Sequence, residues 1–189
     1  MRSVVLLIGF GALSPAALAH VDEAFCPLEE GIEWVMDMKI TKPTGESRDF
    51  VCRMKIGPKQ IQDGTTYYKF TGFRDGREAP LNEYLLRRDD TGYYCLQTGA
   101  EELTLKFPII AENRWPATAG TVGETAVIGA EDITVNTVLY KGCWHTLTKN
   151  EAGTINRWYA HNIGLVRMEA MQFGGVLTFN LREFKPGKK

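Results

Sequence analysis

The chain has 189 residues, of which 22 are basic and 23 are acidic. The opposite charges are interspersed, and only the last five residues, 185–189, form a basic run. Nucleic-acid binding needs clustered Lys and Arg, so this balance argues against nucleic acid as a partner. A chain of this size is expected to form one domain with a sizeable core.

The first 19 residues have the features of a secretory signal peptide. Arg2 gives a short positive segment, residues 4–13 form an apolar run, and Ala-Leu-Ala at 17–19 is the small-x-small pattern that precedes cleavage at His20. The run is too short to span a bilayer, and no later apolar stretch is long enough. We therefore expect a single mature domain over 20–189, with no transmembrane segment, in the periplasm or secreted.

Two segments of the mature chain resemble each other at an offset of 72 residues. Residues 56–69 align without gaps with residues 128–141, and six of the fourteen positions are identical. Each segment follows a proline that lies seven residues before a tryptophan, namely Pro27 with Trp34 and Pro108 with Trp115. We predict two related halves, about 26–98 and 107–184. The alternative is that β-hairpins simply resemble one another.

Alternation of apolar and polar residues predicts β-strands along nearly all of the mature chain. Between 49 and 56, for example, Phe50, Cys52 and Met54 share one face, and we expect that face to lie toward the core. A loop is expected at 119–123. Strands are expected at 34–41, 49–56, 66–73, 82–88, 93–97, 102–106, 125–128, 133–135, 138–148, 154–160, 165–169 and 176–184.

Short, glycine-containing links between these strands favour antiparallel pairing of successive strands. About ten twisted strands do not remain flat. The predicted fold is therefore all-β: an antiparallel meander of about ten strands, curved into a barrel or half-barrel. A two-sheet sandwich is the alternative.

Four aromatic residues are weak candidates for ligand contact: Trp34, Trp115, Trp158 and Tyr159. A tryptophan near the beginning of a strand buries a large area, so Trp34 and Trp115 are expected mainly as equivalent core residues. Lining of a ligand cavity is the alternative. Trp158 and Tyr159 are adjacent in a predicted strand and face opposite sides, so one of them is expected to pack inward.

Three segments resemble a family of exported bacterial β-proteins to which no activity is assigned. Residues 27–34 match its P-L-x-x-G-x-x-W motif, Phe107-Pro108-Ile109 with Trp115 matches a second copy, and 158–166 is similar to its W-Y-A-x-x-V-G-L-V motif. The chain departs from the family at Glu112, where the second copy has glycine, and at His161-Asn162, where the family often has proline and glycine. The resemblance implies an envelope location and a curved all-β domain, distantly similar to periplasmic lipoprotein carriers.

The mature chain keeps four cysteines, Cys26, Cys52, Cys95 and Cys143. An even number in an oxidising compartment predicts disulfides, for which four cysteines allow three connectivities. A bond between Cys52 and Cys95 would require the sheet to close on itself, because a simple meander separates them by about three strand spacings, on the order of 14 Å. Buried thiols that pack as small apolar groups are the alternative.

One cluster has residue types that bind Zn²⁺ or form a Cys/His nucleophile pair. Cys143 and His145 would share a strand face, and His161 would come from a later hairpin. Ordinary packing roles are the alternative, since two ligands at i and i+2 are a weak metal pattern. The chain carries no nucleotide-binding or hydrolase motif, and we predict no cofactor.

Three functions are compatible with these features. The first, which the sequence favours, is a noncatalytic envelope protein that binds a partner protein or cell-surface component through its sheet. The second is a carrier that encloses an apolar ligand, such as a lipid tail, and it predicts a cavity that side chains leave unfilled. The third is a hydrolase, which predicts that polar residues converge in a cleft.

Overall fold

The structure is a computed structural model that describes residues 24–187 except 76, 78, 79, 98, 119, 120 and 173. The predicted signal peptide and its cleavage site lie outside the described residues. Every regular element in the described part is a β-strand, which confirms the all-β prediction. The described residues include no helix with the length and apolar character that crossing a membrane requires.

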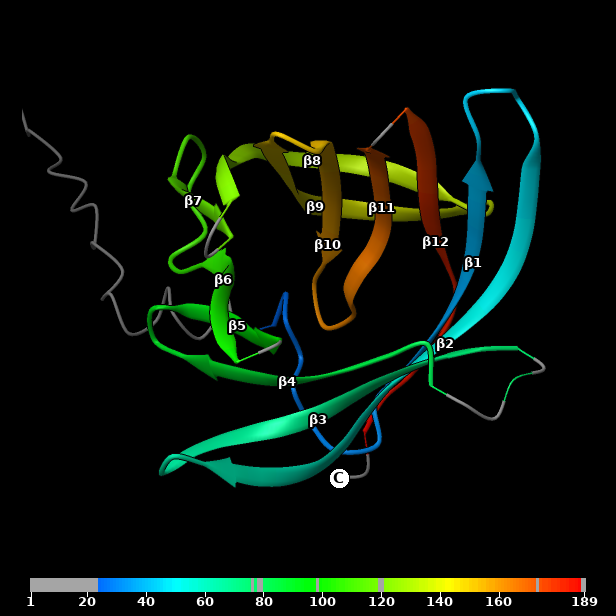
Figure 1. Ribbon diagram of the computed structural model, residues 1–189. Helices are drawn as coiled ribbons and strands as arrows, with labels where there is room; N and C mark the ends of the chain where they lie inside the picture. The colour runs from blue at the N-terminus through cyan, green and yellow to red at the C-terminus, as the bar shows by residue number, and fades with distance from the viewer. Residues whose placement is uncertain are drawn as a thin grey trace, which may run out of the picture.

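Twelve strands are present in the described part of the chain, and each pairs antiparallel with a neighbour in one sheet. The spatial order is β6-β5-β4-β3-β2-β1-β12-β11-β10-β9-β8-β7 (Figure 1). The strands are β1 Glu33–Thr41, β2 Ser47–Gln62, β3 Thr65–Arg74, β4 Asn82–Asp89, β5 Gly92–Gln97, β6 Ala100–Lys106, β7 Arg114–Thr118, β8 Thr121–Val135, β9 Val138–Asn150, β10 Gly153–Ala160, β11 Gly164–Gln172 and β12 Gly175–Lys185.

The sheet curves into a nearly closed barrel, as the sequence predicts. Its two edge strands, β6 and β7, are consecutive in the chain, and a side chain bridges them: Trp115 on β7 donates its indole N–H to the carbonyl of Leu103 on β6, at 2.9 Å. Apolar side chains pack along this seam, including Leu105, Phe107 and Ile109. The meander therefore closes through packing where its hydrogen-bonded ladder stops.

Two details of the strand prediction are wrong. The short strand β7 was not among the expected strands. It contains Pro116, and proline is tolerated on edge strands, of which β7 is one. The segments 125–128 and 133–135 belong to one long strand, β8, which already includes residues 121–123 of the expected loop. Bulges interrupt the alternation of β8 near Ile128 and Asp132, so its pattern looked like two strands.

The distal part of the β8–β9 hairpin folds over the outer face of the sheet, which is the side turned away from the barrel interior. Figure 1 shows these two strands passing behind β10, β11 and β12. At the tip, the Asn136 side-chain amide donates to Asp37 on β1, at 2.9 Å, and to the Leu181 carbonyl on β12, at 3.2 Å. The two bulges of β8 account for the bend, since bulges redirect a strand. The barrel is thus locally covered by a second layer.

The loops that lead into β1 and β7 make the same hydrogen bonds. We call residues 27–32 and 108–113 the lead-in loops. The N–H of Gly31 donates to the Ile56 carbonyl at 2.9 Å, and the N–H of Glu112 donates to the Val127 carbonyl at 2.9 Å. Gly31 has φ 91° and Glu112 has φ 69°. Both loops therefore place a residue in the left-handed region of backbone space, which glycine adopts at lowest cost.

These bonds pair Ile56 with Val127, whereas the gapless sequence match pairs Ile56 with Ile128. Ile56 is fully buried, as is Val127, but Ile128 is 50% exposed. A shift of one residue moves a strand's side chains to the opposite face, so the match is out of register with the structure here. Duplication of an ancestral half remains a prediction.

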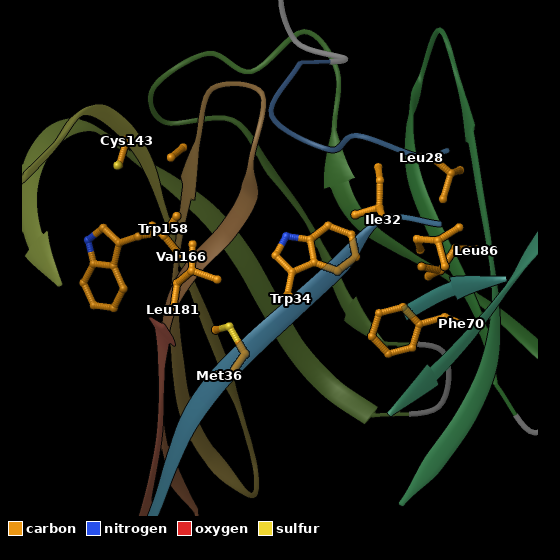
Figure 2. Close-up of a cluster of buried hydrophobic side chains, with 12 residues drawn as sticks. Leu28, Ile32, Trp34, Met36, Phe70, Leu86, Cys143, Trp158, Val166 and Leu181 are labelled. Atoms are coloured by element: carbon orange, nitrogen blue, oxygen red, sulfur yellow. The ribbon is translucent and has the colours of Figure 1, made fainter. Parts of the chain in front are cut away.

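The main core cluster spans both sides of the sheet (Figure 2). Trp34 and Trp158 lie on opposite sides of the ribbons between them. The indole N–H of Trp34 donates to the Ile163 carbonyl in the β10–β11 turn, at 2.7 Å, and so ties β1 to that hairpin. Trp158 lies under the β8–β9 hairpin. Trp34 therefore packs inside the curved sheet, and Trp158 packs between the sheet and the β8–β9 hairpin that forms the second layer.

Candidate functional site

The barrel interior holds a partly open cavity of about 600 Å³. Cavities of this size commonly hold one small-molecule ligand. Side chains from β1 to β6 and from β10 to β12 line it, so both halves of the chain contribute. Its aromatic lining consists of Phe25, Trp34, Phe70, Tyr84, Tyr93 and Tyr159.

Strand alternation explains which residues reach the cavity. On β10, Ile155, Arg157 and Tyr159 point inward, and the residues between them point outward. On β11, Met168 and Ala170 point inward in the same way. We call the side that lines the cavity the inner face of the sheet, and the opposite side its outer face.

The two ends of the cavity differ in polarity. The segment before β1 covers one end, where Phe25 and Cys26 lie beside Tyr159 and Leu165. The other end has polar side chains from strand termini. These residues are Asn82, Gln97, Glu102 and Gln172. This arrangement, apolar at the covered end and polar at the other, suits a molecule with one apolar and one polar part.

Most titratable groups of the inner face are neutral near pH 7. Burial raises the pKa of Tyr84, Tyr93 and Tyr159 above the ordinary value of 10.0. Burial also raises the pKa of Cys95 to about 12, with a smaller contribution from Glu102. These groups add polar atoms without adding charge, because desolvation disfavours the ionised form.

The charged side chains in the cavity lining are Arg157 and Glu102. The Arg157 guanidinium donates to the Thr148 hydroxyl at 2.9 Å. Both residues also line a smaller space of about 50 Å³ beside the β6–β7 seam, together with Thr104, Thr148 and Asn150. A polar lobe thus adjoins the aromatic cavity.

The outer face of β10 is packed instead. His145 stacks on Trp158 with ring centroids 4.5 Å apart, and its Nε2 lies 2.9 Å from the Asn156 side-chain oxygen. Its Nδ1 lies 3.1 Å from Glu131, which also accepts the Trp158 indole N–H at 2.7 Å. Both ring nitrogens are therefore occupied, and within the described ranges neither contacts a hydroxyl or thiol. A histidine that activates a nucleophile needs such a contact.

The predicted metal cluster is not assembled. The Cys143 thiol is fully buried and lies 3.7 Å from the Tyr140 carbonyl, whereas His161 is in the β10–β11 turn, in edge contact with Phe25. Among the described residues, no three His, Cys, Asp or Glu side chains are grouped to hold a metal ion. The sequence placed these residues on neighbouring elements but did not reveal that β9 bends away over the outer face.

The disulfide prediction is not supported. No disulfide joins the four cysteines, all of which lie in the described part of the chain. Cys52 on β2 and Cys95 on β5 are separated by three strand spacings, on the order of 14 Å. Cys143 is packed on the outer face, and burial raises its pKa to about 11. The alternative of buried thiols describes Cys26, Cys52 and Cys143 better, and Cys95 is a half-buried thiol.

The four aromatic candidates divide into two groups. Trp34 and Tyr159 line the cavity, whereas Trp115 closes the seam and Trp158 packs on the outer face. Ligand contact by Trp34 and Tyr159 remains a prediction. Arg157 was not among the residues predicted from the sequence, although alternation over 154–160 places it on the same face as Tyr159. A cation on a face otherwise expected to be apolar was the available signal.

No protein-family profile matches the chain, and no curated protein matches it. Among solved structures, an exported protein with a YmcC-like fold from Bacteroides fragilis and a lipoprotein from Parabacteroides distasonis each have 14% identity and a TM-score of 0.49, over 85% of this chain and 98% of theirs. A LolA superfamily protein from Nitrosomonas europaea has 8% identity and a TM-score of 0.33, over 94% of this chain and 96% of its own.

Proposed function

We propose that the chain is a noncatalytic carrier, exported to the cell envelope, that holds one amphipathic ligand inside its barrel. The observation that carries this proposal is the cavity of about 600 Å³, which side chains leave unfilled. Its aromatic and aliphatic lining favours an apolar ligand portion, because removing apolar surface from water is favourable. The predicted signal peptide supports the location.

The carrier explains the structure better than the interaction module that the sequence favours. The edges of the sheet, β6 and β7, face each other across the seam, and the outer face of β10 is covered by the β8–β9 hairpin. Surfaces that would recruit a partner strand or sheet are thus partly occupied within the chain. A hydrolase has less support, since His145 contacts Trp158, Asn156 and Glu131 and, among the described residues, no hydroxyl or thiol.

Filling the cavity tests the proposal. Ala170 points into the cavity, whereas the next residue, Met171, is 53% exposed on the outer face. We expect Ala170→Phe to weaken displacement of a fluorescent apolar probe by a long-chain lipid at least about tenfold, because the added ring occupies ligand volume. The matched control Met171→Phe should bind like the unaltered protein.

Native mass spectrometry of protein purified from its own envelope provides an independent readout. We expect a lipid-sized adduct on the unaltered chain and on Met171→Phe, but a depleted adduct on Ala170→Phe. If the unaltered chain neither carries an adduct nor binds the probe, the carrier proposal is wrong. Thermal melting of all three proteins establishes that they are folded.

A further inference from the structure

Arg157 differs from two other partly buried arginines of the chain, Arg87 and Arg167, each of which is paired with a carboxylate. Arg87, with a side chain 19% exposed, pairs with Glu101 at 2.5 Å and also with Asp89. Arg167 pairs with Glu169. Arg157 makes its one hydrogen bond to the neutral Thr148 hydroxyl and, among the described residues, has no carboxylate oxygen within ion-pair distance.

An unpaired guanidinium beside an apolar cavity is costly. Charged side chains are rarely removed from water without a counter-charge, because desolvation is not offset. A guanidinium has five N–H donors in a planar fork, and the Thr148 hydroxyl accepts from a single one. The remaining donors can bind a carboxylate or phosphate in the bidentate manner that arginine favours.

The surroundings of Arg157 divide into a polar and an apolar side. The polar lobe beside the seam offers the hydroxyls of Thr104 and Thr148. Across the barrel, the cavity wall is built by Trp34, Met54, Phe70 and Leu86 from β1 to β4. A ligand with its head group at Arg157 can therefore extend its apolar part along this wall.

We propose that Arg157 binds the anionic head group of the ligand, so that the chain carries an amphiphile whose carboxylate or phosphate lies at β10 and whose apolar chain fills the cavity. This inference rests on the carrier function proposed above and defines the ligand class. Glu102 lines the same lobe and opposes a negative head group. Because Glu102 is partly exposed, solvent screens that repulsion. The charge of Arg157 therefore determines the preference for an anionic head group.

Two ligands of equal chain length separate charge recognition from simple apolar binding. Palmitate and hexadecanol are each used to displace the fluorescent probe from the full mature chain at pH 7.5. We expect palmitate to bind more tightly. Arg157→Met should lower the affinity for palmitate by about 10- to 100-fold, which is the range for loss of a charge-assisted hydrogen bond. The affinity for hexadecanol should change by less than about threefold.

Three further variants control for changes that do not depend on charge. Arg157→Lys should recover part of the palmitate affinity, since it keeps the positive charge but not the fork. Glu102→Gln should raise the affinity for palmitate by about two- to fivefold, because it removes a nearby negative charge. Arg114→Met removes an exposed arginine that pairs with Glu124, and it should change the affinity for neither ligand.

The outcomes distinguish this inference from the carrier proposal. If neither ligand binds the unaltered protein, the carrier function itself fails. If both bind equally and Arg157→Met weakens neither selectively, the chain is a carrier but Arg157 is not a head-group site. Lysophosphatidic acid, which has one tail and a phosphate, identifies the head group: tighter binding than palmitate assigns a phosphate, and weaker binding assigns a carboxylate.

Discussion

The two faces of β10 meet different neighbours. On the outer face, Trp158 is stacked against His145 and hydrogen-bonded to Glu131, and the β8–β9 hairpin covers it. On the inner face, Arg157 and Tyr159 border a cavity of about 600 Å³. Trp158 thus lies in a filled layer, whereas its neighbours in sequence, Arg157 and Tyr159, lie beside an unfilled space.

The difference indicates how the fold divides stability from binding. An open cavity forfeits packing contacts along its wall, so the chain needs compensating contacts elsewhere. The hairpin that folds over the outer face supplies them through the buried Trp158 and the hydrogen bond from its indole to Glu131. We therefore expect outer-face substitutions to change folding, and inner-face substitutions to change ligand binding.

The largest effect is expected for Trp158→Ala. Truncation leaves a void beneath the hairpin and removes the indole donor to Glu131, so the free energy of unfolding should fall by about 3–5 kcal/mol. Urea denaturation followed by circular dichroism measures it. Met171→Ala, on an exposed part of the outer face, should change stability by no more than about 0.5 kcal/mol. A loss below about 1 kcal/mol for Trp158→Ala would contradict a packed outer layer.

A smaller effect is expected on the outer face of β3–β6, which the hairpin does not cover. Glu101 accepts hydrogen bonds from Arg87 and from the Tyr67 hydroxyl. These bonds lower the pKa of Glu101 below its ordinary value of 4.5, and the bond from Arg87 contributes most. The stability that they add is present above pH 4.5 and is lost as the pH falls through the folded-state pKa. Glu101→Gln should cost about 1 kcal/mol at pH 7.

The pH dependence provides the check on Glu101. Urea midpoints measured from pH 7 to pH 3 should fall less steeply for Glu101→Gln than for the unaltered chain, and the two curves should converge in acid. Glu83→Gln is a suitable control, because among the described residues Glu83 pairs only with Lys69, and both side chains are partly exposed. Parallel curves for Glu101→Gln and the unaltered protein would show that this carboxylate does not contribute.

The smallest effect is expected from an experiment that needs no substitution. It compares the reactivity of one thiol from each face. Cys95 lines the cavity and Cys143 is fully buried on the outer face, with pKa values raised to about 12 and about 11. Both should react slowly with iodoacetamide at pH 8, because little thiolate is present. Access then decides the order, so we expect Cys95 to be labelled before Cys143.

Bound ligand sharpens the comparison of thiols. Saturating palmitate should slow labelling of Cys95 and leave Cys143 unchanged, as followed by peptide mass spectrometry. Equal protection of both thiols would indicate general stabilisation of the fold and not occupation of the cavity. Labelling in urea, where both should react at similar rates, controls for intrinsic reactivity.

The sequence by itself determined the strand content and its order. Alternation and glycine turns predicted nearly all strands, including 82–88 and 138–148, because a half-buried strand needs a period of two. Alternation also places Arg157 with Tyr159 on one face. It failed at β7, where Pro116 hides an edge strand, and at β8, where bulges break the period.

Only the tertiary structure decided what each face meets. Neither Trp158 nor His145 signals that the hairpin tip reaches Asp37, since that contact spans 99 residues and depends on bends at bulges. The unfilled interior is likewise a property of barrel curvature, which sets the distance between β4 and β10 independently of any local pattern. Local sequence fixes which side a residue faces, and closure of the sheet fixes whether that side is filled.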